Sequence, residues 1–289
     1  MKVGLIGTGL MGLPMAQRLV AAEDVALWAY NRTESKLAPL RSVSVAIASS
    51  VSELVHHCDV LILMLSDAPA IQAVLLSSEV RPLLANRTVI QMGTIAPSQS
   101  REIAIAITAA GGDYLEAPVL GSIPEATAGK LQVMVGSSEA QFQQWASLLQ
   151  HFGTPRWIGE VGAAAALKLA LNQLIGSLTT AFALSVGFVQ RQGVEVETLM
   201  EILRQSALYA PTFDKKLQRM VDRDFANPNF PTKHLLKDMN LALTEAEAAG
   251  LHGDALAGVC QILMQACELG LQDQDYSALF EAVNPSSKG

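Results

Sequence analysis

The chain has 289 residues, of which 50% are hydrophobic and 16% are charged, and its 20 basic and 27 acidic side chains give a net charge of −7. A chain of this length exceeds the usual size of one hydrophobic core, so we expect two domains. An acidic protein has no electrostatic reason to bind nucleic acid or an anionic membrane, which excludes both as expected partners, and any phosphate must be met by a local site.

Up to about residue 160, short apolar runs alternate with helical patterns. The expected strands are 2–6, 25–30, 43–47, 59–65, 88–92, 114–116 and 131–135, and the expected helices are 10–22, 50–57, 68–76, 97–110 and 138–151. Continuous apolar strands that alternate with helices are typical of a mainly parallel sheet covered on both faces. The pattern therefore predicts an α/β domain, with a Rossmann-type doubly wound parallel sheet, over residues 1–161.

A glycine-rich turn, GTGLMG, follows the first expected strand at once. Gly7 permits a tight exit from the strand, Gly9 lets the backbone approach a pyrophosphate, and Gly12 lets the next helix pack closely on the sheet. Backbone N–H groups at the start of that helix, including those of Leu10 and Met11, would face the phosphates. Such a turn is weak support by itself, but its place between two expected strands predicts a dinucleotide-binding site.

The end of the second expected strand indicates which dinucleotide is bound. NAD sites normally place Asp or Glu here to hold the ribose 2′-hydroxyl, whereas this chain has Asn31, Arg32 and Thr33. A guanidinium can pair with a 2′-phosphate, so we expect NADP(H) in preference to NAD(H) and count these three residues as cofactor contacts. The alternative is a solvated loop in which Arg32 contacts nothing. Met64 and Leu65, at the end of the fourth expected strand, are further candidate cofactor contacts.

After Ala163 the strand signals vanish and helical periodicity continues to about residue 282, which predicts an all-α domain over residues 162–289. Its expected helices are 163–191, which would connect the two domains, then 195–206, 211–222, 232–249, 254–269 and 275–282, with a frayed tail from Pro285. The uncharged stretch from Leu174 to Val189 falls short of the roughly 20 apolar residues of a membrane span, so we interpret it as a buried core helix. Because the first helix is apolar nearly all round, we expect a homodimer or higher homo-oligomer.

The cysteine and histidine content indicates no metal site. Cys58, Cys260 and Cys267 lack metal-ligand spacing, and an odd count without a CxxC pair predicts reduced, buried thiols in a cytoplasmic protein. The five histidines form no constellation, so no metal is expected. The first expected strand begins at residue 2, so we expect no cleavable leader.

Lys168 is the one charged residue between Glu160 and Arg191. It lies four residues before Asn172, so both side chains project from one face of the expected helix. A lone lysine at a helix start can simply reach solvent, but an amide on the same face favours a catalytic role. A partly desolvated lysine could act as the general acid that protonates an oxygen as hydride arrives.

Four ordered motifs resemble the β-hydroxyacid dehydrogenase family over nearly the whole chain. They are the glycine turn, the Glu116-Ala117-Pro118-Val119-Leu120-Gly121-Ser122 segment, the helix with Lys168 and Asn172, and Lys237-Asp238. The resemblance implies that Lys168 is the catalytic acid/base and that Asn172 orients the substrate. It implies that the 118–122 loop, with Leu120, Gly121 and Ser122, holds the substrate carboxylate through backbone N–H groups.

The same resemblance assigns four more residues. It places Thr94 between nicotinamide and substrate and lets Lys237 reach the cofactor, while Phe230 and Asp238 would close the pocket from the helical domain. Without the family, Thr94 could cap a helix, Phe230 could belong to the core, and Lys237 with Asp238 could be a solvated ion pair.

Within the family the chain looks most like the glyoxylate/succinic semialdehyde reductase branch, through Glu116 and the Asn31-Arg32-Thr33 segment. It departs from the family pattern at Leu120, where a serine is usual, and at Ser122, where many relatives have glycine. The first change removes a hydroxyl donor to the substrate carboxylate but leaves the backbone donors, so it bears on the substrate and not on the reaction class.

The expected function is therefore NADPH-dependent reduction of a small carboxylate-bearing aldehyde, glyoxylate or succinic semialdehyde, with the proton supplied by Lys168. One alternative is oxidation of 3-hydroxyisobutyrate or another 3-hydroxyacid. An alternative of another class is a nucleotide-sensing binding module without turnover, against which the presence of Lys168 and the lack of a basic tail both count.

Overall fold

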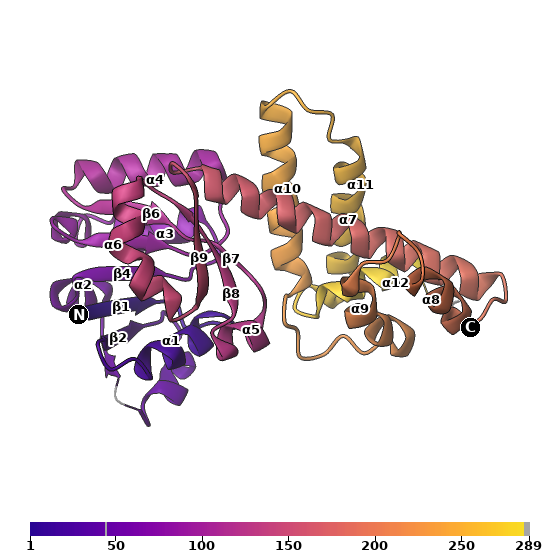
Figure 1. The fold of residues 1–289 in the computed structure, drawn as a ribbon, viewed down its shortest axis with the longest axis horizontal. Helices are drawn as coiled ribbons and strands as arrows, with labels where there is room; N and C mark the ends of the chain where they lie inside the picture. Colours follow the sequence, from indigo (N-terminus) through magenta and orange to yellow (C-terminus); the bar gives the residue numbers. More distant parts are fainter. Residues whose placement is uncertain (44, 286–289) are drawn as a thin grey trace. The chain divides into compact units, whose positions relative to one another are not determined.

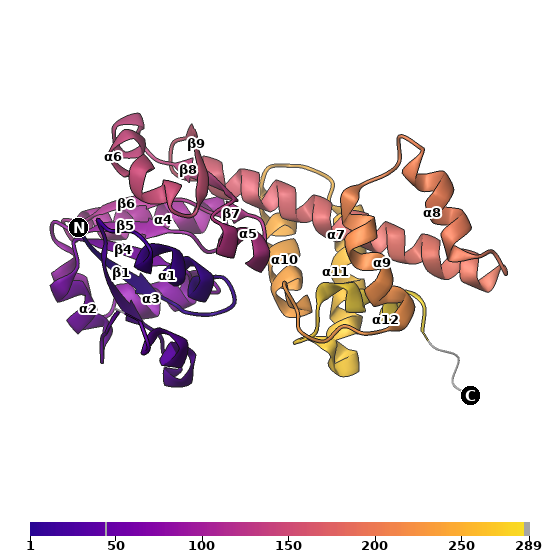
Figure 2. The same ribbon diagram turned by 60° about the horizontal axis from the view of Figure 1, so that its bottom comes forward.

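A computed structural model describes residues 1–43 and 45–285. The chain divides into two compact units, unit 1 from Met1 to Lys168 and unit 2 from Leu169 to Gly289, and Figures 1 and 2 trace its course. The division falls inside helix α7, Ala163–Arg191. The domain boundary predicted between residues 161 and 162 stays a prediction.

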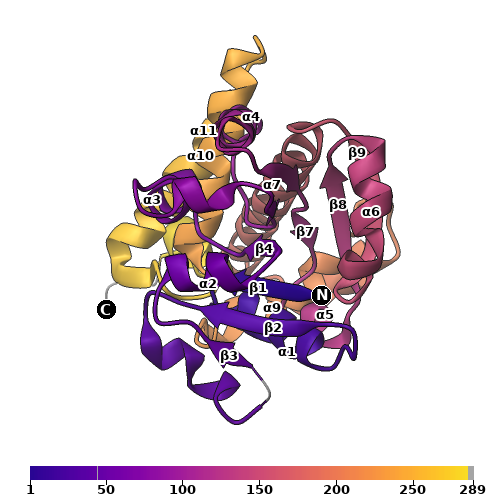
Figure 3. The same cartoon turned by 90° about the vertical axis from the view of Figure 1, so that its left-hand side faces the viewer.

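Unit 1 is built on a mainly parallel sheet. Within the described residues its strands are β1 Lys2–Ile6, β2 Ala26–Tyr30, β3 Ala46–Ile47, β4 Val60–Leu63, β5 Thr88–Gln91, β6 Asp113–Glu116, β7 Val119–Leu120, β8 Leu131–Gly136 and β9 Gly153–Gly159. They run in the order β3-β2-β1-β4-β5-β6-β8-β7, with β9 paired to β8, and Figure 3 shows the β3 end of this order. The pairs from β3 to β6 are parallel, whereas β8 is antiparallel to β6 and β7. The first six strands have the doubly wound order of a dinucleotide-binding domain, as predicted.

Helices cover both faces of this sheet because the side chains of its strands alternate in direction. The helical segments are α1 Gly12–Val20, η1 Glu34–Leu40, α2 Val51–His57, α3 Ala68–Leu75, η2 Arg81–Leu84, α4 Pro97–Ala109, α5 Ile123–Ala128 and α6 Glu139–Gln150. Val60 and Ile62 join the core cluster that includes α1 and α6, while Leu61 and Leu63 join the cluster that includes α2, α3 and α4.

Two strands, the helix α5 and the 3-10 segments η1 and η2 of unit 1 were not predicted. Strand β9 has the sequence GTPRWIG and is mostly exposed or half-buried, so it carries no apolar run. Strand β7 has two residues, and α5 has six, which is too short for helical periodicity. Of the predicted strand 43–47, the structure has Ala46 and Ile47 as strand β3. Residue 44 of the predicted strand lies outside the described residues.

Unit 2 is all helical apart from an isolated bridge between Pro231 and Asp275 in its described part. After α7 come α8 Val196–Arg204, α9 Pro211–Asp222, α10 Thr232–Ala248, α11 Asp254–Ala266, the π-helix η3 Cys267–Leu271, η4 Tyr276–Ala278 and α12 Leu279–Val283. The hairpin of α10 and α11 is visible in Figures 1 and 2. The predicted frayed tail falls largely on residues 286–289, outside the described residues. An all-α second half is thereby confirmed.

Helix α7 is long and apolar enough to cross a membrane by length and composition, and 39% of its most apolar window is buried. Phe182 and Val186 lie in the core of unit 2, whereas Leu174, Leu184 and Phe188 are 52%, 61% and 62% exposed. The predicted core helix is therefore buried along one face. A homo-oligomer that covers the other face stays a prediction.

All three cysteines are free thiols. Cys58 and Cys260 are buried and Cys267 is half-buried. Burial raises the pKa of the Cys58 thiol to about 12, so this thiol stays protonated and unreactive at neutral pH. The cytoplasmic location inferred from the cysteine content stays a prediction.

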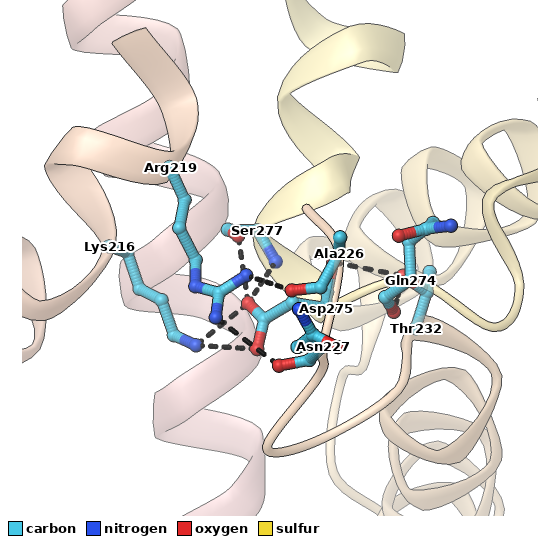
Figure 4. A network of polar contacts seen from close by, with 8 residues as sticks. All are labelled: Lys216, Arg219, Ala226, Asn227, Thr232, Gln274, Asp275 and Ser277. Carbon is cyan, nitrogen blue, oxygen red and sulfur yellow. Dashed lines mark hydrogen bonds and ion pairs between the residues drawn. The ribbon is translucent and has the colours of Figure 1, made fainter. Parts of the chain in front are cut away.

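A buried ion pair fixes the start of α10 in unit 2 (Figure 4). Lys216 Nζ donates to both carboxylate oxygens of Asp275, at 2.7 and 2.9 Å, and Ser277 donates to the same carboxylate through its N–H and its hydroxyl. Next to this carboxylate, the N–H of Thr232 donates to the carbonyl of Gln274 at 2.9 Å. The first turn of α10 is thus held against the segment before η4.

Lys216→Met should destabilise unit 2, because it leaves the Asp275 carboxylate buried without its cation, a loss of about 3–5 kcal/mol for a buried pair. We expect faster amide hydrogen exchange in α10 and in residues 272–277. The matched control is Lys215→Met, since Lys215 is the exposed neighbour of Lys216. Equal protection of α10 in the two variants would contradict the role given to this pair.

Candidate active site

The candidate cofactor site lies where three parallel strands of unit 1 end. Ile6, Leu63 and Gln91 are register neighbours at the carboxyl ends of β1, β4 and β5. In a doubly wound sheet, ligands bind at this edge, next to the strand where the order reverses, and here that strand is β1. The glycine turn, Met64-Leu65 and Thr94 all follow these strand ends, so the fold brings together residues predicted separately.

The three glycines of the turn differ in what requires them. Gly7 has φ +102°, and a Cβ on it would lie 2.4 Å from the Met64 carbonyl oxygen. A Cβ on Gly12 would lie 1.9 Å from the Gly7 carbonyl oxygen. Both are therefore required by packing within the chain. A Cβ on Gly9 would meet nothing within 4 Å, so the space beside Gly9 is open to a ligand, as a pyrophosphate site needs.

Asn31 and Thr8 connect the glycine turn to the end of β2. The Thr8 N–H donates to Asn31 Oδ1 at 3.0 Å, and Asn31 Nδ2 donates to the Thr33 carbonyl at 2.9 Å. Asn31, predicted as a cofactor contact, thus uses its amide inside the chain to hold the loop. Arg32 is exposed, and its guanidinium makes no hydrogen bond or ion pair with the described residues, so it is available to an anion.

Thr94 follows β5 and is half-buried. The Gln91 side chain fixes the turn before it, because Nε2 donates to the Gly93 carbonyl and Oε1 accepts from the Gly93 N–H. The N-cap of α4 is Ala96, so Thr94 is not the N-cap of that helix and the alternative role considered for it fails at this position.

The predicted substrate loop, 118–122, contains the two-residue strand β7, in which Val119 pairs with Val133 and Leu120 with Gln132. Gly121 follows with φ +130°, a conformation that favours glycine. Ser122 then caps α5, and both its N–H and its hydroxyl donate to the Glu125 carboxylate at 2.8 Å. The Ser122 N–H, which was predicted to meet a substrate carboxylate together with the other backbone donors of the loop, is therefore engaged by Glu125, as is the Ser122 hydroxyl.

Lys168 lies in the second turn of α7 and is 9% exposed. That burial removes the alternative in which its side chain simply extends into solvent. A buried lysine ammonium that lies beside a reacting oxygen can act as its general acid.

Asn172, four residues further along α7, belongs to a buried polar cluster of unit 2. Its Nδ2 donates to Asp238 Oδ2 at 2.7 Å, and the two residues are 1% and 2% exposed. Lys237 Nζ lies 2.8 Å from Asp238 Oδ1, an ion-pair distance without hydrogen-bond geometry. Asp238 is therefore buried, and the alternative of a solvated pair fails for its carboxylate.

The amide oxygen of Asn172 is buried and has no hydrogen-bond partner among the described residues. A carboxylate only accepts hydrogen bonds, so the NH₂ of Asn172 must face Asp238 and the oxygen must face away. An unsatisfied buried acceptor costs about 1–3 kcal/mol, which a donor on a bound molecule would recover.

Phe230 lies just before α10, and His234 lies in the first turn of that helix. The Phe230 ring is half-buried and packs edge-to-face on Tyr276, with 5.8 Å between ring centroids. This contact agrees with the alternative that Phe230 packs against the core of unit 2. Burial, with Lys237 and Lys233 nearby, lowers the pKa of His234 and favours its neutral form. Within the described residues no group of His, Cys, Asp and Glu side chains could hold a metal ion.

Glu116 belongs to the 116–122 motif and to the pattern of the reductase branch, but no role was predicted for its side chain. It is 1% exposed, and its carboxylate accepts from the N–H groups of Gly162 and Ala165 at the start of α7. Burial raises the pKa of this carboxyl above its ordinary value. The sequence signal that could have found it is a carboxylate that directly follows two large hydrophobic residues of the strand, Tyr114 and Leu115.

Comparison with known proteins identifies the family. A family model described as the NAD binding domain of 6-phosphogluconate dehydrogenase matches residues 2–163, and one described as the NAD-binding of NADP-dependent 3-hydroxyisobutyrate dehydrogenase matches residues 162–283. The chain is 32% identical to glyoxylate/succinic semialdehyde reductase 2, chloroplastic, of Arabidopsis thaliana, over 98% of this chain and 79% of that protein. It belongs to the β-hydroxyacid dehydrogenase family.

Two further members of the β-hydroxyacid dehydrogenase family support this assignment. The 2-hydroxy-3-oxopropionate reductase of Escherichia coli (strain K12) is 32% identical over 98% of this chain and 97% of that protein. The crystal structure of 3-hydroxyisobutyrate dehydrogenase from Salmonella typhimurium has a TM-score of 0.86 at 25% identity and covers 97% of this chain and 99% of that chain. The protein is an NAD(P)-dependent oxidoreductase that acts on CH–OH groups, which confirms the predicted enzyme class.

Substitution of Gly9 and of Gly12 should have different effects in this dehydrogenase. Gly9→Ala should melt like the wild type without cofactor but bind NADPH and NADH more weakly, because its methyl group enters only the open space. Gly12→Ala should be less stable by about 1–3 kcal/mol or more, as expected when a methyl group overpacks a filled site. Thermal melts and calorimetric titration separate the two effects. Wild-type cofactor affinity in Gly9→Ala would remove the pyrophosphate role from this turn.

Proposed function

We propose that the protein reduces a small carboxylate-bearing aldehyde, glyoxylate or succinic semialdehyde, to the hydroxyacid with NADPH. The observation that carries the proposal is the pair on α7: a buried Lys168 and, one turn later, an Asn172 whose oxygen is an unsatisfied acceptor. The names of two 32% identical relatives, a glyoxylate/succinic semialdehyde reductase and a 2-hydroxy-3-oxopropionate reductase, support the direction and the substrate class.

Each group has a separate task in this reaction. When bound, the nicotinamide supplies the hydride that adds to the aldehyde carbon. The Lys168 ammonium gives its proton to the aldehyde oxygen as the carbonyl electrons move there, and is left as an amine. Asn172, held by Asp238, keeps its oxygen fixed so that it can accept a hydrogen bond from the hydroxyl that forms on the product, because the aldehyde itself has no hydrogen-bond donor.

The substrate carboxylate needs donors, and the loop 118–122 offers few side-chain ones. Leu120 has no hydroxyl, and the donors of Ser122 already serve Glu125. We therefore assign carboxylate binding to backbone N–H groups of this loop, as the family resemblance implies. Because Leu120 replaces the serine that is usual in the family, the pocket selects its substrate by shape more than by hydrogen bonds. We therefore expect it to accept more than one semialdehyde.

Preference for NADPH is supported by Arg32. It stands where NAD sites carry an acid, it is exposed, and its guanidinium has no partner within the described residues. Asn31 holds the turn that carries it, through hydrogen bonds to Thr8 and Thr33. A guanidinium fixed at its base and open at its tip can pair with a 2′-phosphate through two N–H groups.

Arg32→Ala should raise the Michaelis constant for NADPH roughly ten- to hundredfold, which corresponds to the loss of a charge-assisted pair. The Michaelis constant for NADH should change little in Arg32→Ala. In Arg32→Glu, the ratio of the Michaelis constant for NADH to that for NADPH should fall below the wild-type ratio. Arg41→Ala is the matched control, because Arg41 is exposed on the same segment but pairs with Glu34 at 2.6 Å. If Arg32→Ala affects both cofactors equally, the assignment of NADP(H) is wrong.

Oxidation of a 3-hydroxyacid is the second candidate. It is favoured by the match of residues 162–283 to the model described as NADP-dependent 3-hydroxyisobutyrate dehydrogenase. The same residues would serve, with Lys168 as the amine that takes the proton from the hydroxyl.

A substrate panel tests the reaction, and Lys168→Ala tests the mechanism. We expect NADPH oxidation with glyoxylate or succinic semialdehyde to exceed that with tartronate or methylmalonate semialdehyde, with 3-hydroxyisobutyrate oxidation measured in parallel. Lys168→Ala should lower kcat by roughly 10²- to 10⁴-fold, the usual contribution of a general acid. The control Lys130→Ala removes an exposed lysine of unit 1. Wild-type turnover in Lys168→Ala would refute the mechanism.

A further inference from the structure

Glu116 buries a carboxylate at the end of β6, where burial is unfavourable. Tyr114 and Leu115 before it and Ala117 after it are also buried. Taking a carboxylate out of water costs several kcal/mol unless hydrogen bonds replace those of water. Because burial raises the pKa of Glu116, the folded state binds its proton more tightly than the unfolded state, and this group lowers stability as pH rises above its unfolded value. Stability alone does not account for a carboxylate here.

The carboxylate receives its hydrogen bonds from the beginning of α7. Its Oε1 accepts from Gly162 N at 2.8 Å and from Ala165 N at 3.0 Å, across 46 and 49 residues of chain. The first N–H groups of a helix have no partner within the helix, and a negative charge is favoured there. Glu116 is thus the cap of α7, supplied by a strand rather than by the residue before the helix.

The other carboxylate oxygen and the facing strand keep the side chain in place. Ser100 Oγ donates to Glu116 Oε2 and lies 2.8 Å from the Tyr114 hydroxyl. Gly136 pairs with Glu116 across β6 and β8, and a Cβ at Gly136 would lie 2.4 Å from Glu116 Oε1. The sequence therefore leaves a space at residue 136 that the carboxylate fills.

Glu116 holds two parts of the proposed chemistry at once. It directly precedes Ala117 and the 118–122 loop, which is proposed to hold the substrate carboxylate. Ala165, which it caps, lies three residues before Lys168, about 4.5 Å along the helix axis at the standard rise. One side chain thereby fixes the distance between the start of the loop and the lysine.

We propose that Glu116 is a positioning residue that acts through Lys168: by capping α7 it sets the place of the Lys168 ammonium relative to the 118–122 loop. The inference rests on the proposed role of Lys168 as general acid. A displacement of about 1 Å in a reacting group can cost on the order of a hundredfold in rate, so an anchor of this kind affects turnover more than binding.

Glu116→Asp and Glu116→Gln distinguish reach from charge. The aspartate keeps the charge but is one methylene shorter, so its oxygens no longer reach Gly162 and Ala165. The glutamine keeps an acceptor oxygen at the same distance. We expect Glu116→Asp to lower kcat roughly ten- to hundredfold with an unchanged Michaelis constant for NADPH, and Glu116→Gln to lower it far less. Amides in the first turn of α7 should exchange faster in the aspartate variant.

Two further variants guard against a simple folding defect. Gly136→Ala leaves Glu116 in the chain but pushes its carboxylate away from Gly162, and it should reproduce the loss in kcat. Glu160→Asp shortens an exposed carboxylate two residues before Gly162 and should have no effect. Faster exchange in the first turn of α7 with wild-type kcat would show that the cap is structural only and would overturn the inference.

A double-mutant cycle separates this inference from the proposed function. If Glu116 acts through Lys168, Glu116→Asp lowers kcat in the wild type but leaves the residual kcat of Lys168→Ala unchanged. The same loss in both backgrounds would overturn the positioning role while leaving Lys168 as the acid. Wild-type turnover in Lys168→Ala alone would instead reject the proposed function on which the inference rests.

Discussion

The hydrogen bonds that Gly162 and Ala165 donate to Glu116 fix the beginning of α7. That helix carries Lys168 and Asn172, and a slip of one residue along it would turn both side chains by about 100°. A strand, a helix start and a catalytic candidate are therefore held by one buried carboxylate. Burying the Glu116 carboxylate costs stability, and this cost is offset because the carboxylate accepts hydrogen bonds from N–H groups that have no partner within α7. Glycine at residue 136 leaves the space that the carboxylate occupies.

The candidate cofactor site in unit 1 also depends on glycines, which let backbone groups come close together because they have no side chain. Gly7 and Gly12 are needed because carbonyl oxygens of the chain occupy the space of a Cβ, whereas Gly9 faces open space. Only Gly9 therefore points to a ligand. A buried hydrogen bond has a similar effect within unit 2. There Asp238 fixes the orientation of the Asn172 amide and leaves the amide oxygen as an acceptor. In both places a buried hydrogen bond inside the chain determines which atom is presented to a bound molecule.

Periodic elements were predicted closely and contacts were not. The bounds of α7 and α9 agree with the predicted ranges, because long helices repeat their apolar stripe many times. Strand β9 was missed because its edge position leaves it without an apolar run. Arg32 was predicted as a cofactor contact from its place after β2. The hydrogen bond that the Asn31 amide accepts from the Thr8 N–H could not be predicted in the same way. The engagement of Ser122 by Glu125 is a local capping pattern that the sequence does contain, three residues apart, and it was overlooked.

The sequence by itself determined the alternation of strands and helices, the glycine turn, the helical second half, and the family with its NAD(P)-dependent chemistry. These properties are encoded in windows of a few to thirty residues, where hydrophobic period and turn residues decide the local structure. The tertiary structure alone decided that Glu116 caps α7 and that Asp238 orients Asn172, across 46 and 66 residues of chain. Partners so distant are set by which strands and helices become neighbours, because a buried polar group must find its hydrogen bonds wherever the packed chain offers them.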